Sequence, residues 1–123
     1  MLHAQITHIR VLGVNLTREQ RMEIRRSLGK KLGKFARSIG RISVSVKDVN
    51  GPRGGIDQLV RIKVILSNLP NVVFERQDAS LDAAIRGALD GVERTVRRSL
   101  QRRRMKPIKV GVRSITRLGA NEI

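Results

Sequence analysis

The 123-residue sequence contains no cysteine, tryptophan or tyrosine, and only two phenylalanines, Phe35 and Phe74. The absence of cysteine excludes disulfide bonds, thiolate metal ligands and thiol nucleophiles. Because aromatic rings are so scarce, the sequence argues against domains that stack nucleic-acid bases on aromatic platforms. No apolar run approaches the ~20 residues that a membrane-spanning helix needs, and the first ten residues lack the apolar core of a signal peptide. These absences predict a soluble, cytoplasmic protein with no membrane partner.

Acidic residues are also few, since 10 Asp and Glu face 26 Lys and Arg and give a net charge of +16 at pH 7. Hydrophobic residues make up 40% of the chain, which is enough for the core of one folded domain. The charge is uneven: residues 18–37 hold eight bases and two acids, residues 38–85 six and five, and residues 86–123 eleven and three. Such an imbalance makes a polyanion the first partner to consider.

Alternating apolar residues predict a strand within residues 2–16, ending near Gly13 and Asn15. Thr17 with Gln20 three residues later is typical of a capping box, which predicts a helix over residues 18–37. Its apolar stripe is spaced by three or four residues, and Gly40 is expected to close it. The stripe comprises Ile24, Leu28, Leu32, Phe35 and Ile39.

Three further strands are predicted over residues 41–47, 59–66 and 72–77, joined by a long loop over 48–56 and a turn over 68–71. Ser80 is a predicted N-cap for a last helix that reaches about residue 103. The expected fold is α+β in the order β-α-β-β-β-α, a four-stranded sheet with two helices packed on one face. Residues 1–104 form the predicted domain, and residues 105–123 form a flexible basic tail.

At 100° per residue, many helical cations lie away from the apolar stripes, so both helices should present basic faces outward on one side of the sheet. A charged helix face is often only solvated, but these bases have few acidic neighbours and are mostly Arg, which suits bidentate phosphate contacts. The predicted RNA-binding residues are Arg26, Lys30, Lys34, Arg37, Arg86, Arg94, Arg97, Arg98 and Arg102. Glycine pairs at 29 and 33, and at 87 and 91, predict a close approach between the helices or of a helix to the RNA backbone.

The sequence offers no convincing catalytic or metal site. His3 and His8 fall on opposite faces of the predicted strand, and the set Asp48, Asn50 and Asp57 lacks EF-hand spacing. The Gly-rich loop at 51–55 is followed by a strand instead of the Lys-Ser/Thr of a P-loop. We therefore expect no enzyme activity, no cofactor, no metal and no small-molecule substrate.

Several short motifs resemble the ribosome hibernation-promoting factor family, which includes the ribosome-associated inhibitors and sigma-54 modulation proteins. They are Gln5-Ile6-Thr7, the junction Ile39-Gly40-Arg41-Ile42-Ser43-Val44, the loop Asp48-Val49-Asn50-Gly51-Pro52, and in the last helix Ala83-Ala84-Ile85, Leu89 and Val92-Glu93-Arg94-x-Val96. The last group is similar to the family pattern A-I, L, L-E-R-Q-L, in which Arg94 matches the family arginine. Two positions depart from the pattern: Asp82 replaces an aromatic residue, and Gly91 replaces a lysine.

The resemblance implies a fold related to double-stranded RNA-binding domains and docking on the small ribosomal subunit. There the protein would occupy the mRNA and tRNA channel, contact ribosomal RNA with its basic helix faces and inhibit translation under stress or in stationary phase. The chain resembles the short form, without the dimerising C-terminal domain of long members. Two alternatives stay open: a generic double-stranded RNA- or DNA-binding protein, for example in ribosome assembly, and a protein-interaction module with an acidic partner.

Overall fold

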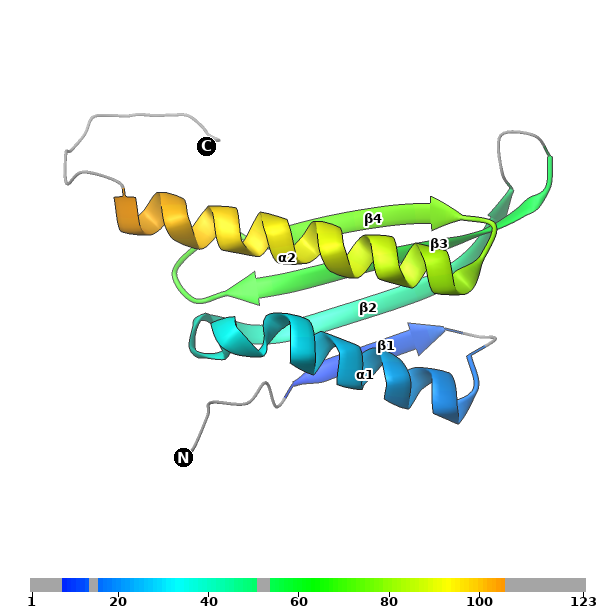
Figure 1. The fold of residues 1–123 in the computed structure, drawn as a ribbon, viewed down its shortest axis with the longest axis horizontal. Helices are drawn as coiled ribbons and strands as arrows, with labels where there is room; N and C mark the ends of the chain where they lie inside the picture. The colour runs from blue at the N-terminus through cyan, green and yellow to red at the C-terminus, as the bar shows by residue number, and fades with distance from the viewer. Residues whose placement is uncertain (1–7, 14–15, 51–53, 106–123) are drawn as a thin grey trace.

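The computed structural model describes residues 8–13, 16–50 and 54–105 of the chain. In chain order these form β1 (Ile9–Gly13), α1 (Arg18–Leu32), the 3-10 helix η1 (Gly33–Ser38), β2 (Ile39–Asn50), β3 (Ile56–Leu66), β4 (Val72–Asp78) and α2 (Leu81–Met105). Both α-helices cover the same face of the sheet, and both run in the same direction (Figure 1). The predicted α+β fold with the order β-α-β-β-β-α is confirmed.

The sheet has the strand order β1-β2-β3-β4, which places β1 and β4 at its edges. β2, β3 and β4 form the predicted antiparallel meander, whereas β1 pairs parallel to β2. A parallel pair needs a crossover connection, and α1 with η1 supplies it. The register places Val11, Val44 and Ile62 side by side on three neighbouring strands.

The core lies between the sheet and the helix layer, because alternate strand residues and one stripe of each helix are buried together. From the strands it takes Val11, Ile39, Ile42, Val44, Val46, Val60, Ile62, Val64, Leu66 and Val72, and from the helices Ile24, Leu28, Leu32, Ala84, Ala88, Leu89, Val92 and Val96. The opposite face of the sheet is not covered by either helix (Figure 1).

The start of α1 is fixed by the predicted capping box. The Gln20 backbone N–H donates to Thr17 Oγ1 at 3.0 Å, and the Thr17 backbone N–H donates to Gln20 Oε1 at 2.8 Å. One turn into the helix, Arg21 donates to the carbonyl oxygens of Val11 at 3.3 Å and Gly13 at 2.9 Å. The guanidinium therefore ties the end of β1 to α1.

The helix predicted over residues 18–37 is present, but it changes type before its end, and its predicted stop at Gly40 was wrong. The α-helix ends at Leu32, and η1 continues it as a 3-10 helix to Ser38. Ile39 begins β2 instead of completing the helical stripe, and Gly40 lies within that strand. The weak helix formers Gly29 and Gly33 favour a change of helix type at this point, and the narrower 3-10 turn still buries Ala36.

The long loop predicted over residues 48–56 was also wrong at both ends. Asp48, Val49 and Asn50 continue β2 and pair with the first residues of β3, beginning at Ile56. β-Pairing thus overrides the turn propensity of Asp and Asn here. The strand pattern over residues 2–7, His3 and the tail at 106–123 lie outside the described residues.

Candidate nucleic-acid interface

All nine cations predicted to bind RNA are exposed on the helix layer, as the helical phase predicts. Three of them already have acidic partners. Arg26 pairs with Glu23 at 2.8 Å, and Lys34 and Arg97 each reach one carboxylate oxygen of Glu93 at 2.9 Å. The charge of these three side chains is therefore partly neutralised inside the protein.

Glu93 is the most buried acid of the helix layer, with only 10% of its side chain exposed. It lies on α2, whereas Lys34 lies on η1, so the carboxylate joins the two helical segments. The hydrogen bond from Lys34 holds the pKa of Glu93 below its usual value, against a smaller opposing effect of burial, and the charges of Lys34 and Arg97 add to the lowering. Glu93 therefore stays ionised and fixes two cations in place.

A second ion pair between the helices joins Lys31 to Asp90 at 2.8 Å. Its hydrogen bond raises the pKa of Lys31 and lowers that of Asp90, whose carboxylate also feels the charges of Arg94 and Arg86. Sequence reasoning assigned no role to Lys31, Asp90 or Glu93. The available signal was the spacing of Asp90 and Glu93, which are three residues apart and so share one side of a cationic helix.

The other six predicted residues form no ion pair among the residues that the structure describes. Arg102 donates a long hydrogen bond of 3.5 Å to Ser99 Oγ. The six are Lys30, Arg37, Arg86, Arg94, Arg98 and Arg102. Solvated cations of this kind are available for phosphate oxygens.

These cations do not all share one side of α2. Arg98 follows Gly91 by seven residues and so lies on the same side of the helix, the side that packs on Phe74 of β4. Arg86, by contrast, lines the boundary with α1. The cationic surface therefore wraps around α2 from the α1 side toward the β4 side.

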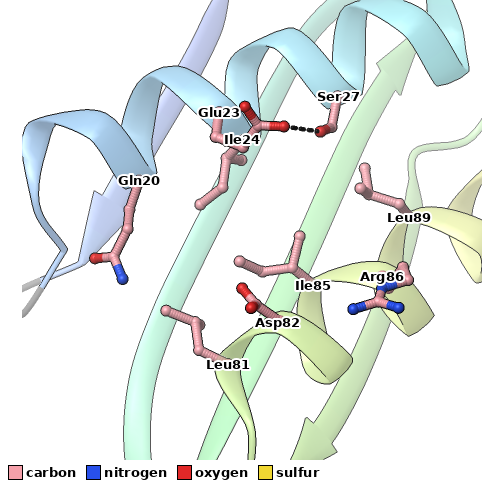
Figure 2. A pocket seen from close by; sticks show the side chains of 9 residues that line it. All are labelled: Gln20, Glu23, Ile24, Ser27, Leu81, Asp82, Ile85, Arg86 and Leu89. Carbon is pink, nitrogen blue, oxygen red and sulfur yellow. Dashed lines mark hydrogen bonds between the residues drawn. The ribbon is translucent and has the colours of Figure 1, made fainter.

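A groove separates the N-terminal halves of α1 and α2 and has a volume of about 190 Å³. Its floor is apolar, with Ile24 from α1 and Leu81, Ile85 and Leu89 from α2, and its rim is polar (Figure 2). Glu23 accepts a hydrogen bond from Ser27 at this rim, and Asp82 projects from the start of α2 (Figure 2). These two acids lie beside one cation, Arg86, so the groove attracts phosphate less than the purely cationic parts of the helix layer.

The glycine pairs do not mediate the predicted approach between the helices. A side chain at Gly91 would collide with the ring of Phe74, and one at Gly87 would approach Nε of Arg76 to 2.9 Å. These glycines let α2 pack closely on β4, while Gly29 and Gly33 face open space. Gly91 stands where the family pattern has a lysine, and in this chain the ring of Phe74 from β4 occupies the space beside it.

His8 is exposed, and no group of three His, Asp or Glu side chains suited to a metal ion is found in ranges 8–13, 16–50 and 54–105. Asp48 and Asp57 accept hydrogen bonds from Gln58 and Gln77 respectively, which gives both carboxylates structural partners. In the same ranges, neither α-helix is both long and apolar enough to cross a membrane.

Residues 7–104 match the family model described as sigma 54 modulation protein / S30EA ribosomal protein. A ribosomal subunit interface protein from Coxiella burnetii has a similar structure, with a TM-score of 0.60, 15% identity and coverage of 77% of this chain and 99% of that one. The N-terminal domain of Protein Y from Thermus thermophilus has a TM-score of 0.56, 25% identity and coverage of 75% and 98%. No curated protein sequence matches the chain.

Proposed function

Because the chain belongs to the sigma 54 modulation protein / S30EA ribosomal protein family, we propose that it is a ribosome-associated inhibitor of translation. It binds the small subunit through the cationic helix layer and occupies the channel for mRNA and tRNA. The observation that carries this proposal is the set of six exposed helical cations without acidic partners in the described part of the chain. The protein acts in the cytoplasm, in stress or stationary phase.

The helix layer supports a mode of binding that reads phosphates and shape. Neither phenylalanine is placed to stack on a base, since Phe74 packs against Gly91 and Phe35 packs partly buried against the core. Arginine predominates among the unpaired cations, and its planar fork suits phosphate oxygens. Inhibition therefore follows from occupancy of the channel and needs no chemical step.

The test compares two double variants that each remove two positive charges. R94Q/R98Q removes unpaired cations of α2. R18Q/R25Q is the matched control, because Arg18 and Arg25 lie on the side of α1 that carries Arg21, the residue hydrogen-bonded to β1. Co-sedimentation with purified small subunits over a range of salt concentrations measures binding.

We expect R94Q/R98Q to weaken binding and to reduce the slope of log K against log salt by about 0.7–0.9 for each phosphate that the variant no longer neutralises. The control should retain the wild-type slope. Equal weakening of binding in both variants would contradict the assignment, because it would show that only net charge matters.

Competition then separates the proposal from a generic nucleic-acid binder. A channel-occluding inhibitor is displaced from the small subunit by mRNA or initiator tRNA, whereas a generic binder prefers free duplex. Binding to a protein partner that survives ribonuclease treatment would favour the module with an acidic partner instead.

A further inference from the structure

The face of the sheet opposite the helices carries a second cluster of cations. Strand alternation places on this face the residues between the buried ones from Arg41 onward in β2 and along the other strands, and the register shows which of them are adjacent. Five exposed bases lie there, Arg10 on β1, Arg41 and Lys47 on β2, and Arg61 and Lys63 on β3. We call these five residues the sheet-face cluster.

The cluster surrounds two small polar residues. Ser43 of β2 is paired with Arg10 of β1 on one side and with Lys63 of β3 on the other. Ser45, two residues along β2, is paired with Leu12 and Arg61. Since neighbouring strands are about 4.8 Å apart, the backbones of residues 10 and 63 lie about 10 Å from each other across Ser43.

Arg41 and Lys47 close the two ends of this site along β2, because they precede Ser43 and follow Ser45 by two residues. Ser43 and Ser45 are thus short side chains with longer basic side chains on their neighbouring positions. Both serines are half-buried, and their hydroxyls have no hydrogen-bond partner among the residues that the structure describes. This part of the sheet therefore offers both positive charge and free hydroxyl donors.

Most of the charge of the cluster is uncompensated. Arg61 pairs with Glu75 of β4 at 3.6 Å, with both side chains about half exposed. Arg10, Arg41, Lys47 and Lys63 form no ion pair within the described ranges. The acid Glu75 limits the cluster on the β4 side.

We propose that the sheet-face cluster is a second phosphate-binding surface, so that the domain holds one RNA segment on its helix layer and another on its open sheet. The composition of the face favours nucleic acid over a protein partner. Protein interfaces have apolar centres that are depleted of charge, whereas nucleic-acid interfaces are polar and strongly positive. Here the centre is serine, and the apolar Leu12, Leu59, Ile65 and Val73 lie around it.

A second copy of the chain is an unsuitable occupant for the same electrostatic reason. Two copies that met through this face would bring two clusters of cations together without acids to offset them, apart from Glu75 and Asp57 at the rim. A phosphate backbone removes that repulsion and accepts hydrogen bonds from the serine hydroxyls. The second surface stands on its own geometry, and only the identity of the RNA as ribosomal depends on the proposed function.

The experiment counts short RNA duplexes bound per protein by native mass spectrometry and sedimentation velocity. A straight duplex of about 10 base pairs, which is about one helical turn, contacts one face at a time because the helix layer and the open sheet face point in opposite directions (Figure 1). We expect the wild-type chain to bind two duplexes and R10Q/K63Q to bind one. R94Q/R98Q should weaken the binding event that R10Q/K63Q retains, and the combination of all four substitutions should bind RNA most weakly of all.

Two further variants sharpen the test. E75Q removes the acid at the rim and should strengthen the binding event that R10Q/K63Q abolishes, whereas K63R keeps the charge and should leave both events intact. All these positions are exposed, and circular dichroism verifies that each variant is folded.

A wild-type stoichiometry of one, or a stoichiometry of two in R10Q/K63Q, would overturn the second surface. Saturation of the sheet face by a polyglutamate peptide that RNA fails to displace would overturn it in favour of an acidic protein partner. If R94Q/R98Q binds as wild type while R10Q/K63Q binds one duplex fewer, the second surface stands and the helix-layer function fails. The two proposals therefore fail separately.

Discussion

Replacement of Glu93 by glutamine should lower stability and raise affinity for RNA at the same time. The carboxylate of Glu93 holds Lys34 and Arg97 at 2.9 Å each and joins η1 to α2. Glutamine keeps the size and shape of the side chain, but it is neutral. E93Q thus removes both ion pairs without opening a cavity.

The magnitude follows from the exposure of the partners. The side chains of Lys34 and Arg97 are 58% and 46% exposed, so both cations remain hydrated. Each pair is then worth about 0.5–1 kcal/mol, close to the upper range of surface pairs, and the 3–5 kcal/mol of a fully buried pair does not apply. E93Q should cost about 1–2 kcal/mol, or about 5–10 °C in Tm for a domain of this size.

Binding should change in the opposite direction, because E93Q releases two cations to phosphate and removes one negative charge from the helix layer. Thermal unfolding followed by circular dichroism gives Tm, and titration of a labelled RNA duplex gives affinity. E23Q is the control, since it makes the same chemical change in a pair whose side chains are 62% and 60% exposed. Equal Tm values for the two variants, or weaker RNA binding by E93Q, would refute the reasoning.

The ion pairs of Glu93 determine the direction in which the stability of the domain changes with pH. The pKa of Glu93 is lower in the folded state than in the unfolded state, chiefly because Lys34 donates to the carboxylate. The stability that Glu93 contributes is therefore complete above the ordinary carboxyl pKa of about 4.3 and is lost as the pH falls through the lower folded value. The difference in Tm between wild type and E93Q should disappear over that range.

Two further predictions concern local packing and capping. G91A should lower Tm because the new methyl group meets Phe74, at a cost of about 1–3 kcal/mol. G29A faces open space and should raise the free energy of unfolding by about 0.5–1 kcal/mol. A higher Tm for G91A would contradict the close packing of α2 on β4. T17A should cost about 1 kcal/mol because it removes the capping box, and an unchanged urea midpoint would show that Gln20 alone caps α1.

The sequence predicted those features that short-range patterns encode. Alternation located the meander strands, and the pair Thr17 and Gln20 located the start of α1 within one residue. Local patterns could not predict which of two competing elements a segment joins. Residues 48–50 have turn propensity, but pairing with β3 decides their conformation, and Ile39 fits a helical stripe although it begins β2.

For the candidate interface too, local patterns predicted some features and missed others. Helical phase correctly placed nine cations at the surface, because exposure depends mainly on position around the helix. Arg26 and Arg97 are paired with local acids, at spacings of three and four residues that the sequence already contains. The partner of Lys34, by contrast, is distant in sequence. Lys34 and Glu93 are 59 positions apart, and nothing in the local pattern of either helix predicts their ion pair at 2.9 Å.

The helix layer is also polarised from end to end, and this polarity narrows where RNA can lie. Glu19 and Asp82 occupy the first turns of α1 and α2, where they favour the helix dipoles, and Glu23 lies beside the groove at that end. Because both helices run in the same direction, their cationic C-terminal halves lie together at the opposite end of the molecule (Figure 1). There the remaining acids, Asp90 and Glu93, are engaged in ion pairs. A phosphate backbone on this layer is therefore favoured across the C-terminal halves of α1 and α2 and disfavoured over the groove, however large the net charge of the whole chain.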